Sequence, residues 1–139
     1  MLKLTRTVFA LAVCLGTYSL QSSPFVVSFT DLLKRRNAED TFTHEVINAQ
    51  QPVVIKVFLP NCGPCNQIKQ AFERLAQTYH GKVRFIEIDF NEFNDLVVNK
   101  LGASTVPTFF FYRNGDQVSN YTGSSPVKLR KALQEALRL

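Results

Sequence analysis

An apolar run that leads directly into a cysteine motif constrains the fold of this chain more than any other stretch. Val53–Leu59 is apolar except for Lys56, and Cys62-Gly63-Pro64-Cys65 follows it almost at once. Continuous apolarity with β-branched residues predicts a central strand that is covered on both faces. From the second cysteine to Tyr79, apolar residues recur at three- and four-residue intervals, which predicts a helix that ends near Gly81. We therefore expect the motif at a junction between strand and helix, with Pro64 at about the first helical position.

A pair of cysteines separated by two residues can form a small disulfide ring or open to a dithiol. At a helix N-terminus the backbone dipole favours the thiolate of Cys62, and the thiolate is the form that attacks disulfides. The same spacing also occurs in half of a zinc site and in unreactive pairs. A zinc site usually has a second such pair or two histidines, whereas Cys14, His44 and His80 are isolated in the sequence. We therefore expect no metal site and no cofactor, and we place the two histidines on the surface.

The first 23 residues differ from the rest of the chain. Lys3 and Arg6 precede a mostly apolar stretch over 8–20, and a polar segment follows, which is the layout of a secretory signal. The stretch is short for a transmembrane helix, but no clear cleavage site follows it, so a cleaved signal and an uncleaved membrane anchor both remain open. Lipidation of Cys14 is disfavoured by Val13, which is a poor fit to lipoprotein signals. We expect an exported protein, periplasmic or extracytoplasmic, or a membrane-anchored one, rather than a cytoplasmic protein.

Composition limits the remaining classes of function. With 139 residues, 45% of them hydrophobic, the chain suits one compact domain. The formal charge is +5, but the cations are scattered, and the longest consecutive run is Lys34-Arg35-Arg36, with no aromatic or glycine-rich element interleaved. We therefore expect no nucleic-acid partner.

The remaining segments predict alternating strands and helices. Asp40 is the expected N-cap of a helix, and Asn114-Gly115 favours a type I′ hairpin turn. A strand that closely follows the central helix predicts parallel pairing with the central strand. The first segment, 25–29, reads either as a strand or as a linker. The expected strands are 25–29, 83–89, 108–112 and 117–122, and the expected helices are 32–36, 41–49, 91–101 and 126–139, the last burying Val127, Leu129, Leu133 and Leu137.

This order of elements, together with its motifs, resembles the thioredoxin family from Asp40 to the C-terminus. The resemblance implies an α/β fold, a thioredoxin-like three-layer sandwich in which a mixed central sheet has helices on both faces. We divide the chain into a signal peptide or anchor at 1–23, a lead-in segment at 24–39 and a thioredoxin-like domain at 40–139. The motifs that carry the resemblance are Cys62-Gly63-Pro64-Cys65, Asp89, Val106-Pro107-Thr108, Asn114-Gly115 and Gly123.

The resemblance implies a thiol-disulfide oxidoreductase that acts on disulfide-containing or dithiol proteins and depends on a redox partner. Cys62, the more exposed thiol, attacks a substrate disulfide, and Cys65 resolves the mixed disulfide. Pro107 is expected in a cis peptide bond beside the disulfide, where Val106 presents its backbone to an extended substrate. Gly63 and Pro64 support the active site. The alternative is a non-catalytic binding module with the same fold, whose cysteines are structural or incidental.

Two departures from the family pattern concern the immediate surroundings of the motif. Asn61 precedes Cys62 where many family members have tryptophan, a residue that this chain lacks altogether. Lys56 stands where thioredoxins place a buried acid that moves protons at the second cysteine. We expect Glu87 on the next strand to pair with Lys56, because Phe85 occupies the family's usual partner position. We further expect the Lys56–Glu87 pair to tune the pKa values of the thiols. The alternative is that Lys56 extends to solvent and has no catalytic role.

Overall fold

A five-stranded mixed sheet is the centre of the computed structural model, which describes residues 24–139. The predicted leader, 1–23, lies outside the described residues. The spatial order of the strands is β1-β3-β2-β4-β5. The three strands β1, β3 and β2 run parallel, as predicted for the central pair. Strand β4 pairs antiparallel with β2, and β5 pairs antiparallel with β4. The strands are β1 (Val26–Ser28), β2 (Val53–Phe58), β3 (Arg84–Asp89), β4 (Thr108–Arg113) and β5 (Asp116–Thr122).

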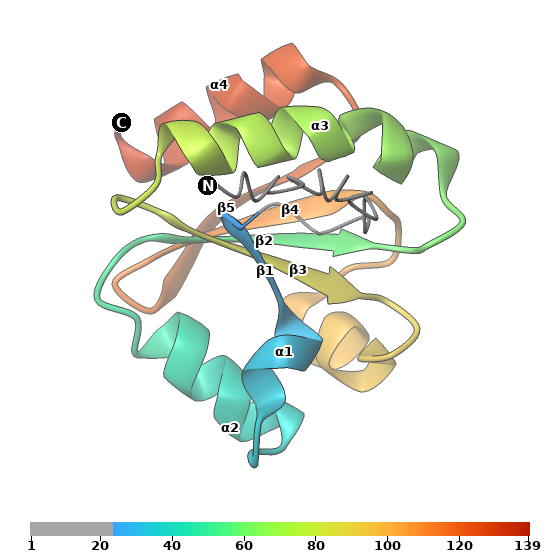
Figure 1. Cartoon of the computed structure of the whole chain (residues 1–139), viewed down its shortest axis with the longest axis vertical. Coiled ribbons are helices and arrows are strands. Elements are labelled where there is room, and N and C mark those ends of the chain that lie inside the picture. The colour runs from blue at the N-terminus through green and yellow to red at the C-terminus, as the bar shows by residue number, and fades with distance from the viewer. Residues whose placement is uncertain (1–23) are drawn as a thin grey trace, which may run out of the picture.

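Helices cover both faces of this sheet, which confirms the predicted three-layer α/β sandwich (Figure 1). On one face lie α3 (Gly63–Thr78) and α4 (Pro126–Leu137). On the other face lie α1 (Phe29–Leu33), α2 (Ala38–Phe42) and two π-helical segments, η1 (Thr43–Ile47) and η2 (Leu96–Leu101).

The apolar run 53–59 forms β2 and separates two hydrophobic cores. Val54 belongs to the core beneath α3 and α4, whereas Ile55 belongs to the core on the opposite face. Phe72 of α3 packs edge-on against Phe85 of β3, with ring centroids 5.3 Å apart. Because both faces of β2 are buried, its sequence has no polar alternation apart from Lys56.

The first two helices begin earlier than predicted. Asn37, not Asp40, is the N-cap of α2: its side-chain oxygen accepts a hydrogen bond from the Asp40 N–H at 2.8 Å. The predicted start at Thr41 was therefore wrong by three residues, because both residues are good caps and local sequence does not rank them. The predicted helix 32–36 is also displaced, since α1 ends at Leu33 and Lys34 has a φ of +46°.

One further helix boundary and the exposure of one residue differ from the sequence prediction. The helix expected from Asn91 begins only at residue 94, because the Asp89 side chain accepts a hydrogen bond from the Asn91 N–H and holds a turn there. Val127 was predicted to be buried but is 74% exposed. Leu129, Leu133 and Leu137 form the buried stripe of α4, and Val127 projects from a different face of the helix.

The hairpin turn is confirmed at Asn114-Gly115. Both residues have positive φ, 53° and 83°, as a type I′ turn requires. A Cβ atom at Gly115 would lie 2.6 Å from the carbonyl oxygen of Ile47 in η1. Glycine is therefore required both by the turn and by the close approach of the hairpin to η1.

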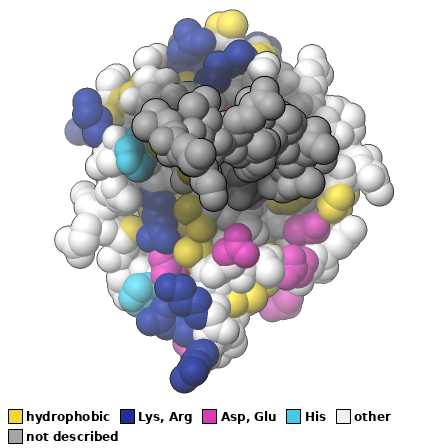
Figure 2. All heavy atoms as spheres, in the orientation of Figure 1, with side chains coloured by type: hydrophobic (Ala, Val, Ile, Leu, Met, Phe, Trp, Pro, Cys, Tyr) yellow, Lys and Arg dark blue, Asp and Glu magenta, His cyan; other side chains and the backbone are white. Residues whose placement is uncertain are grey.

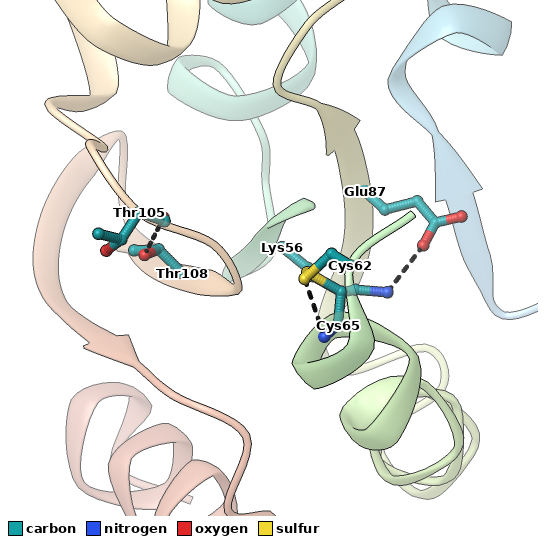
Figure 3. Close-up of a disulfide and its surroundings, with 6 residues drawn as sticks. All are labelled: Lys56, Cys62, Cys65, Glu87, Thr105 and Thr108. Atoms are coloured by element: carbon teal, nitrogen blue, oxygen red, sulfur yellow. Dashed lines mark hydrogen bonds and ion pairs between the residues drawn. A yellow bond between two sulfur atoms is a disulfide. The ribbon is translucent and has the colours of Figure 1, made fainter. Parts of the chain in front are cut away.

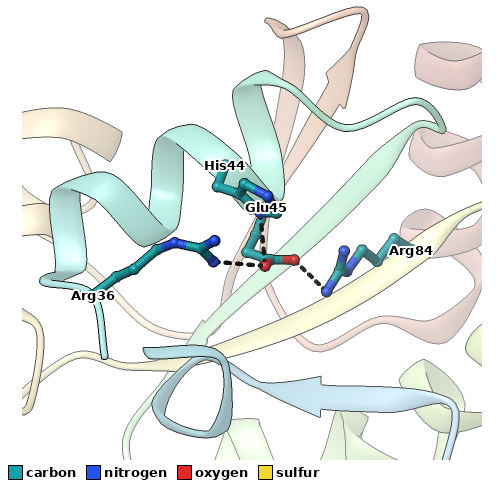
Figure 4. Close-up of polar contacts among 4 residues, drawn as sticks. All are labelled: Arg36, His44, Glu45 and Arg84. Carbon is teal, nitrogen blue, oxygen red and sulfur yellow. Dashed lines mark hydrogen bonds and ion pairs between the residues drawn. The ribbon is translucent and has the colours of Figure 1, made fainter. Parts of the chain in front are cut away.

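A buried carboxylate ties η1 to the start of β3 (Figure 4). Glu45 forms an ion pair with Arg84 at 2.5 Å, lies 3.0 Å from the Nδ1 atom of His44, and is 4.0 Å from Arg36. We call these four residues the Glu45 cluster. The cationic partners keep access to water, because the Arg36 and Arg84 side chains are 44% and 29% exposed.

Charge is unevenly spread over the face of the molecule drawn in Figure 2. Acidic side chains are most frequent in the centre and on the right of the view, whereas Lys and Arg lie along the top, on the left and at the bottom. Within residues 24–139, no helix combines the length and the hydrophobicity that crossing a bilayer requires.

Candidate active site

The cysteine motif lies at the amino end of α3, as the sequence predicts. Cys62 is the N-cap of the helix, and its Sγ accepts a hydrogen bond from the Cys65 N–H at 3.1 Å. The two cysteines form a disulfide, with their Cα atoms 5.2 Å apart. Pro64 occupies the first turn, where its missing N–H leaves no helical hydrogen bond unmade. The helix dipole therefore acts on Cys62 when the disulfide opens.

The two sulfur-bearing residues differ in access to solvent. Cys62 is partly exposed, whereas Cys65 is buried, with 2% of its surface accessible. Gly63 and Pro64 between them are exposed. A substrate therefore meets Cys62 first, and Cys65 can be approached only from the interior side of the motif.

A loop that enters β4 carries the second predicted part of the site. The Val106–Pro107 peptide bond is cis. The Pro107 carbonyl accepts from the Gly123 N–H at 3.1 Å, and the Thr108 hydroxyl donates to the Thr105 carbonyl at 2.8 Å (Figure 3). Val106 is half-buried, and within residues 24–139 its backbone N–H and C=O make no hydrogen bond.

Lys56 lies in the interior, beneath the disulfide. It is 2% exposed, so the alternative that it extends to solvent is wrong. In the β2–β3 register it stands opposite Glu87, and its Nζ lies 3.3 Å from the Glu87 Oε2 (Figure 3). The Nζ atom also lies 5.1 Å and 5.4 Å from the ring centroids of Phe58 and Phe72. These rings contribute cation–π attraction as well as an apolar wall.

Burial decides the direction of the pKa shift of Lys56. Desolvation of the ammonium group lowers this pKa below its ordinary value, and the Glu87 carboxylate offsets only part of that effect. Lys69 lowers the pKa slightly and Glu73 raises it slightly. The ammonium form of Lys56 is therefore stabilised mainly by the Glu87 carboxylate.

A cavity of about 200 Å³ joins Lys56 to the disulfide. Cys65 contributes to its wall, together with both members of the ion pair. The predicted pairing of Lys56 with Glu87 is thus present, and it lies against the buried cysteine rather than the exposed one. The cavity is lined by Lys56, Phe58, Pro60, Cys65, Asn66, Lys69 and Glu87.

Sequence reasoning missed two polar residues of this cavity wall, Asn66 and Lys69. Asn66 and Lys69 follow Cys65 at one and four positions, a helical spacing that identifies Lys69 as a neighbour once α3 is assigned. Phe72 was recognised only as a core residue. His44 belongs to the Glu45 cluster and His80 packs against Phe25, with ring centroids 5.0 Å apart. Both histidines are exposed, and no three potential metal ligands gather within residues 24–139.

Comparison with known proteins identifies the family of the chain. The family model for thioredoxin matches residues 34–135. Thioredoxin 1 of Nostoc sp. is 30% identical over 100 residues, which cover 71% of this chain and 92% of the relative. The crystal structure of Malassezia sympodialis thioredoxin is 33% identical, with a TM-score of 0.62, and the match covers 70% of this chain and 84% of the other. The short form of spinach chloroplast thioredoxin f is 33% identical, with a TM-score of 0.66 and coverage of 80% and 92%. This chain belongs to the thioredoxin family, and it is a thiol-disulfide oxidoreductase with Cys62 and Cys65 as its redox pair.

Proposed function

We propose that the protein exchanges disulfides with protein substrates outside the cytoplasm, attacking through Cys62 and resolving through Cys65. The observation that carries this division of roles is the difference in exposure between the two residues. A bulky substrate disulfide reaches a partly exposed sulfur at a helix N-terminus far more easily than a buried one. The position of Cys62 as N-cap of α3 also favours its thiolate.

In the reducing direction, the thiolate of Cys62 attacks one sulfur of the substrate disulfide. A mixed disulfide forms, and the other substrate sulfur leaves as a thiolate that takes a proton from water. The thiolate of Cys65 then attacks Cys62, the internal disulfide closes, and the second substrate sulfur leaves. The reverse sequence oxidises a substrate dithiol, so the redox partner and the reduction potential decide the net direction.

The loop before β4 provides the place for the substrate backbone. The N–H and C=O of Val106, which have no hydrogen-bond partner in the described part of the chain, can bond an extended segment as an added strand does, with the buried Pro107 fixing the loop behind it. Pro60 and Asn61 are exposed beside Cys62, so the apolar surface on that side is smaller than a tryptophan would provide. Main-chain contacts therefore contribute more to substrate binding than side-chain pockets do.

Trapping experiments test the two roles separately. Insulin reduction with dithiothreitol should be abolished by Cys62→Ser. Cys65→Ser should instead accumulate a mixed disulfide with insulin, which is visible on a non-reducing gel. This species should be absent in the double variant that carries both Cys62→Ser and Cys65→Ser. Turnover by the double variant comparable to that of the wild type would remove the enzymatic role and favour a binding module.

The proposed location is supported by the leader-like sequence of residues 1–23. A fusion of the full chain to a reporter that is active only after export should give signal, and removal of 1–23 should abolish it. Carbonate extraction of the membranes then separates a cleaved signal from a retained anchor. Equal reporter signal without the leader would contradict export.

A further inference from the structure

The buried side of the disulfide contains a charge of unexpected sign. Lys56, Glu87 and Cys65 line one cavity, and of the two members of this ion pair only Lys56 can attract an anion formed at Cys65. The lysine cannot turn away to bulk solvent, because its side chain is only 3% exposed and is enclosed by the rings of Phe58 and Phe72.

We propose that Lys56 supplies the positive charge that stabilises the thiolate of Cys65 during resolution of the mixed disulfide. Glu87 keeps the ammonium group in place while the disulfide is closed, when Cys65 carries no charge. This inference rests on the proposed role of Cys65 as the resolving thiol.

The charges around Cys65 determine the sign of the effect. From β2 the nearby group is the ammonium of Lys56, and from β3 it is the carboxylate of Glu87. On α3, Lys69 lines the same cavity, and Glu73 acts on Lys56 with the opposite sign to Lys69. Lys69 is exposed, so its charge is screened by water, whereas that of Lys56 is not. Lys56 is therefore the cation with the strongest expected effect on Cys65.

The effect is reciprocal, because each charged group favours the charged form of the other. In the disulfide form, Lys56 has one close anion, Glu87, and burial lowers its pKa. When Cys65 ionises, a second anion forms at the wall of the same cavity, so the ammonium becomes better compensated. The reduced, ionised protein gains from Lys56 a stabilisation that the disulfide form lacks.

With Lys56 in this role, resolution of the mixed disulfide by Cys65 remains an ordinary thiol–disulfide exchange. The Cys65 thiol releases its proton to water through the cavity, and its thiolate attacks the Cys62 sulfur of the mixed disulfide. The bond between Cys62 and the substrate breaks, and the substrate sulfur leaves with the electron pair. Lys56 neither gains nor loses a proton in this sequence.

Titration of single thiols tests the proposal directly. In a full-length Cys14→Ser background, Cys62→Ser leaves Cys65 as the only thiol and Cys65→Ser leaves Cys62, and thiolate absorbance is followed against pH. Lys56→Met should raise the pKa of Cys65 by about one unit, a tenfold loss of thiolate at pH values below that pKa. Because nucleophilicity rises as the thiol pKa rises, resolution should slow by only about threefold. The Cys62 titration should move far less.

Two matched variants separate charge from packing. Lys69→Met removes an exposed cation from the same cavity wall and should leave the Cys65 pKa within about 0.3 units, because surface charges are screened. Glu87→Gln removes an anion and should lower that pKa or leave it in place. If Lys56→Met does not fold, the Lys56→Met, Glu87→Gln double variant, which retains no unpaired buried charge, is compared with Glu87→Gln alone.

The outcomes distinguish this inference from the proposed function. An unchanged Cys65 pKa in Lys56→Met, or an equal rise in Glu87→Gln, overturns the charge assignment even if Cys62→Ser remains inactive. Retained insulin reduction by Cys62→Ser instead overturns the roles of the cysteines, whatever the titration shows.

Discussion

The two faces of the sheet bury charge in different ways. On the α2 face, Glu45 has two cationic neighbours, Arg36 and Arg84, whose side chains are 44% and 29% exposed. On the α3 face, Lys56 has one ion-pair partner among residues 24–139, Glu87, and almost no access to solvent. A charge with several solvated partners is well compensated in every state of the protein, whereas a charge with one partner responds to any new ion nearby. The Glu45 cluster therefore serves structure, and Lys56 is sensitive to the redox state of the neighbouring disulfide.

Removing the single partner of Lys56 should give the largest loss of stability. Glu87→Gln leaves a buried ammonium group with only a neutral acceptor, and we expect the free energy of unfolding to fall by about 3 kcal/mol, the lower end of the range for a broken buried pair. Denaturant unfolding of the oxidised protein measures this change.

The matched double variant controls for packing. Lys56→Met, Glu87→Gln should recover most of the loss, because no unpaired charge remains. A double variant that is less stable than Glu87→Gln would mean that packing of the lysine stem, not its charge, dominates.

Alkaline pH should destabilise the face opposite Lys56. Burial raises the pKa of Tyr112 to about 12, and its ring packs against Phe42. The unfolded chain loses this proton near pH 10, so between pH 10 and 12 the folded state binds more protons and stability falls as pH rises. At pH 11, one unit above the pKa of the unfolded chain, the free energy of unfolding should be about 1.4 kcal/mol lower than at neutral pH.

Tyr112→Phe should remove this part of the pH dependence. Unfolding is followed between pH 8 and about 11 in a background that lacks Cys62 and Cys65, which prevents disulfide exchange in alkali. The difference between Tyr112→Phe and its parent should be constant below pH 9 and change above it. A parallel pair of curves would show that Tyr112 titrates alike in the folded and unfolded states.

Removing the carboxylate of the Glu45 cluster should have the smallest effect of the three. Glu45→Gln leaves two arginines that can be hydrated, so we expect a loss of about 1 kcal/mol. The reduction potential of the Cys62–Cys65 pair should stay unchanged, as measured by equilibration with glutathione buffers. A measurable shift of this potential in Glu45→Gln would end the distinction between the two faces.

The sequence was sufficient for the elements that define the site. Uninterrupted apolarity identified β2, helical spacing identified α3, and the motif between them placed Cys62 at the helix N-terminus. The pairing of Lys56 with Glu87 was also predictable, because both lie on neighbouring strands whose order was anticipated.

What the sequence left undetermined depends on contacts between distant residues. The local sequence is as compatible with an exposed Lys56 side chain as with a buried one. The burial depends on Phe72, which is sixteen positions away in the sequence and whose ring lies beside the Lys56 Nζ atom. The choice of Asn37 over Asp40 as N-cap, and the exposure of Val127, depend on how each helix docks on the sheet. Local patterns specify which elements form more reliably than where they begin or which edge they bury.

The parallel course of β1 and β2 also fixes how the reactive end of the domain is presented. β2 delivers the chain to Cys62 at its carboxyl end, whereas β1 starts at the opposite end of the same sheet. Residue 24, which leads into β1, therefore lies at the pole remote from the disulfide. A large folded partner that reaches Cys62 at the amino end of α3 approaches the pole opposite to the one where the described chain begins.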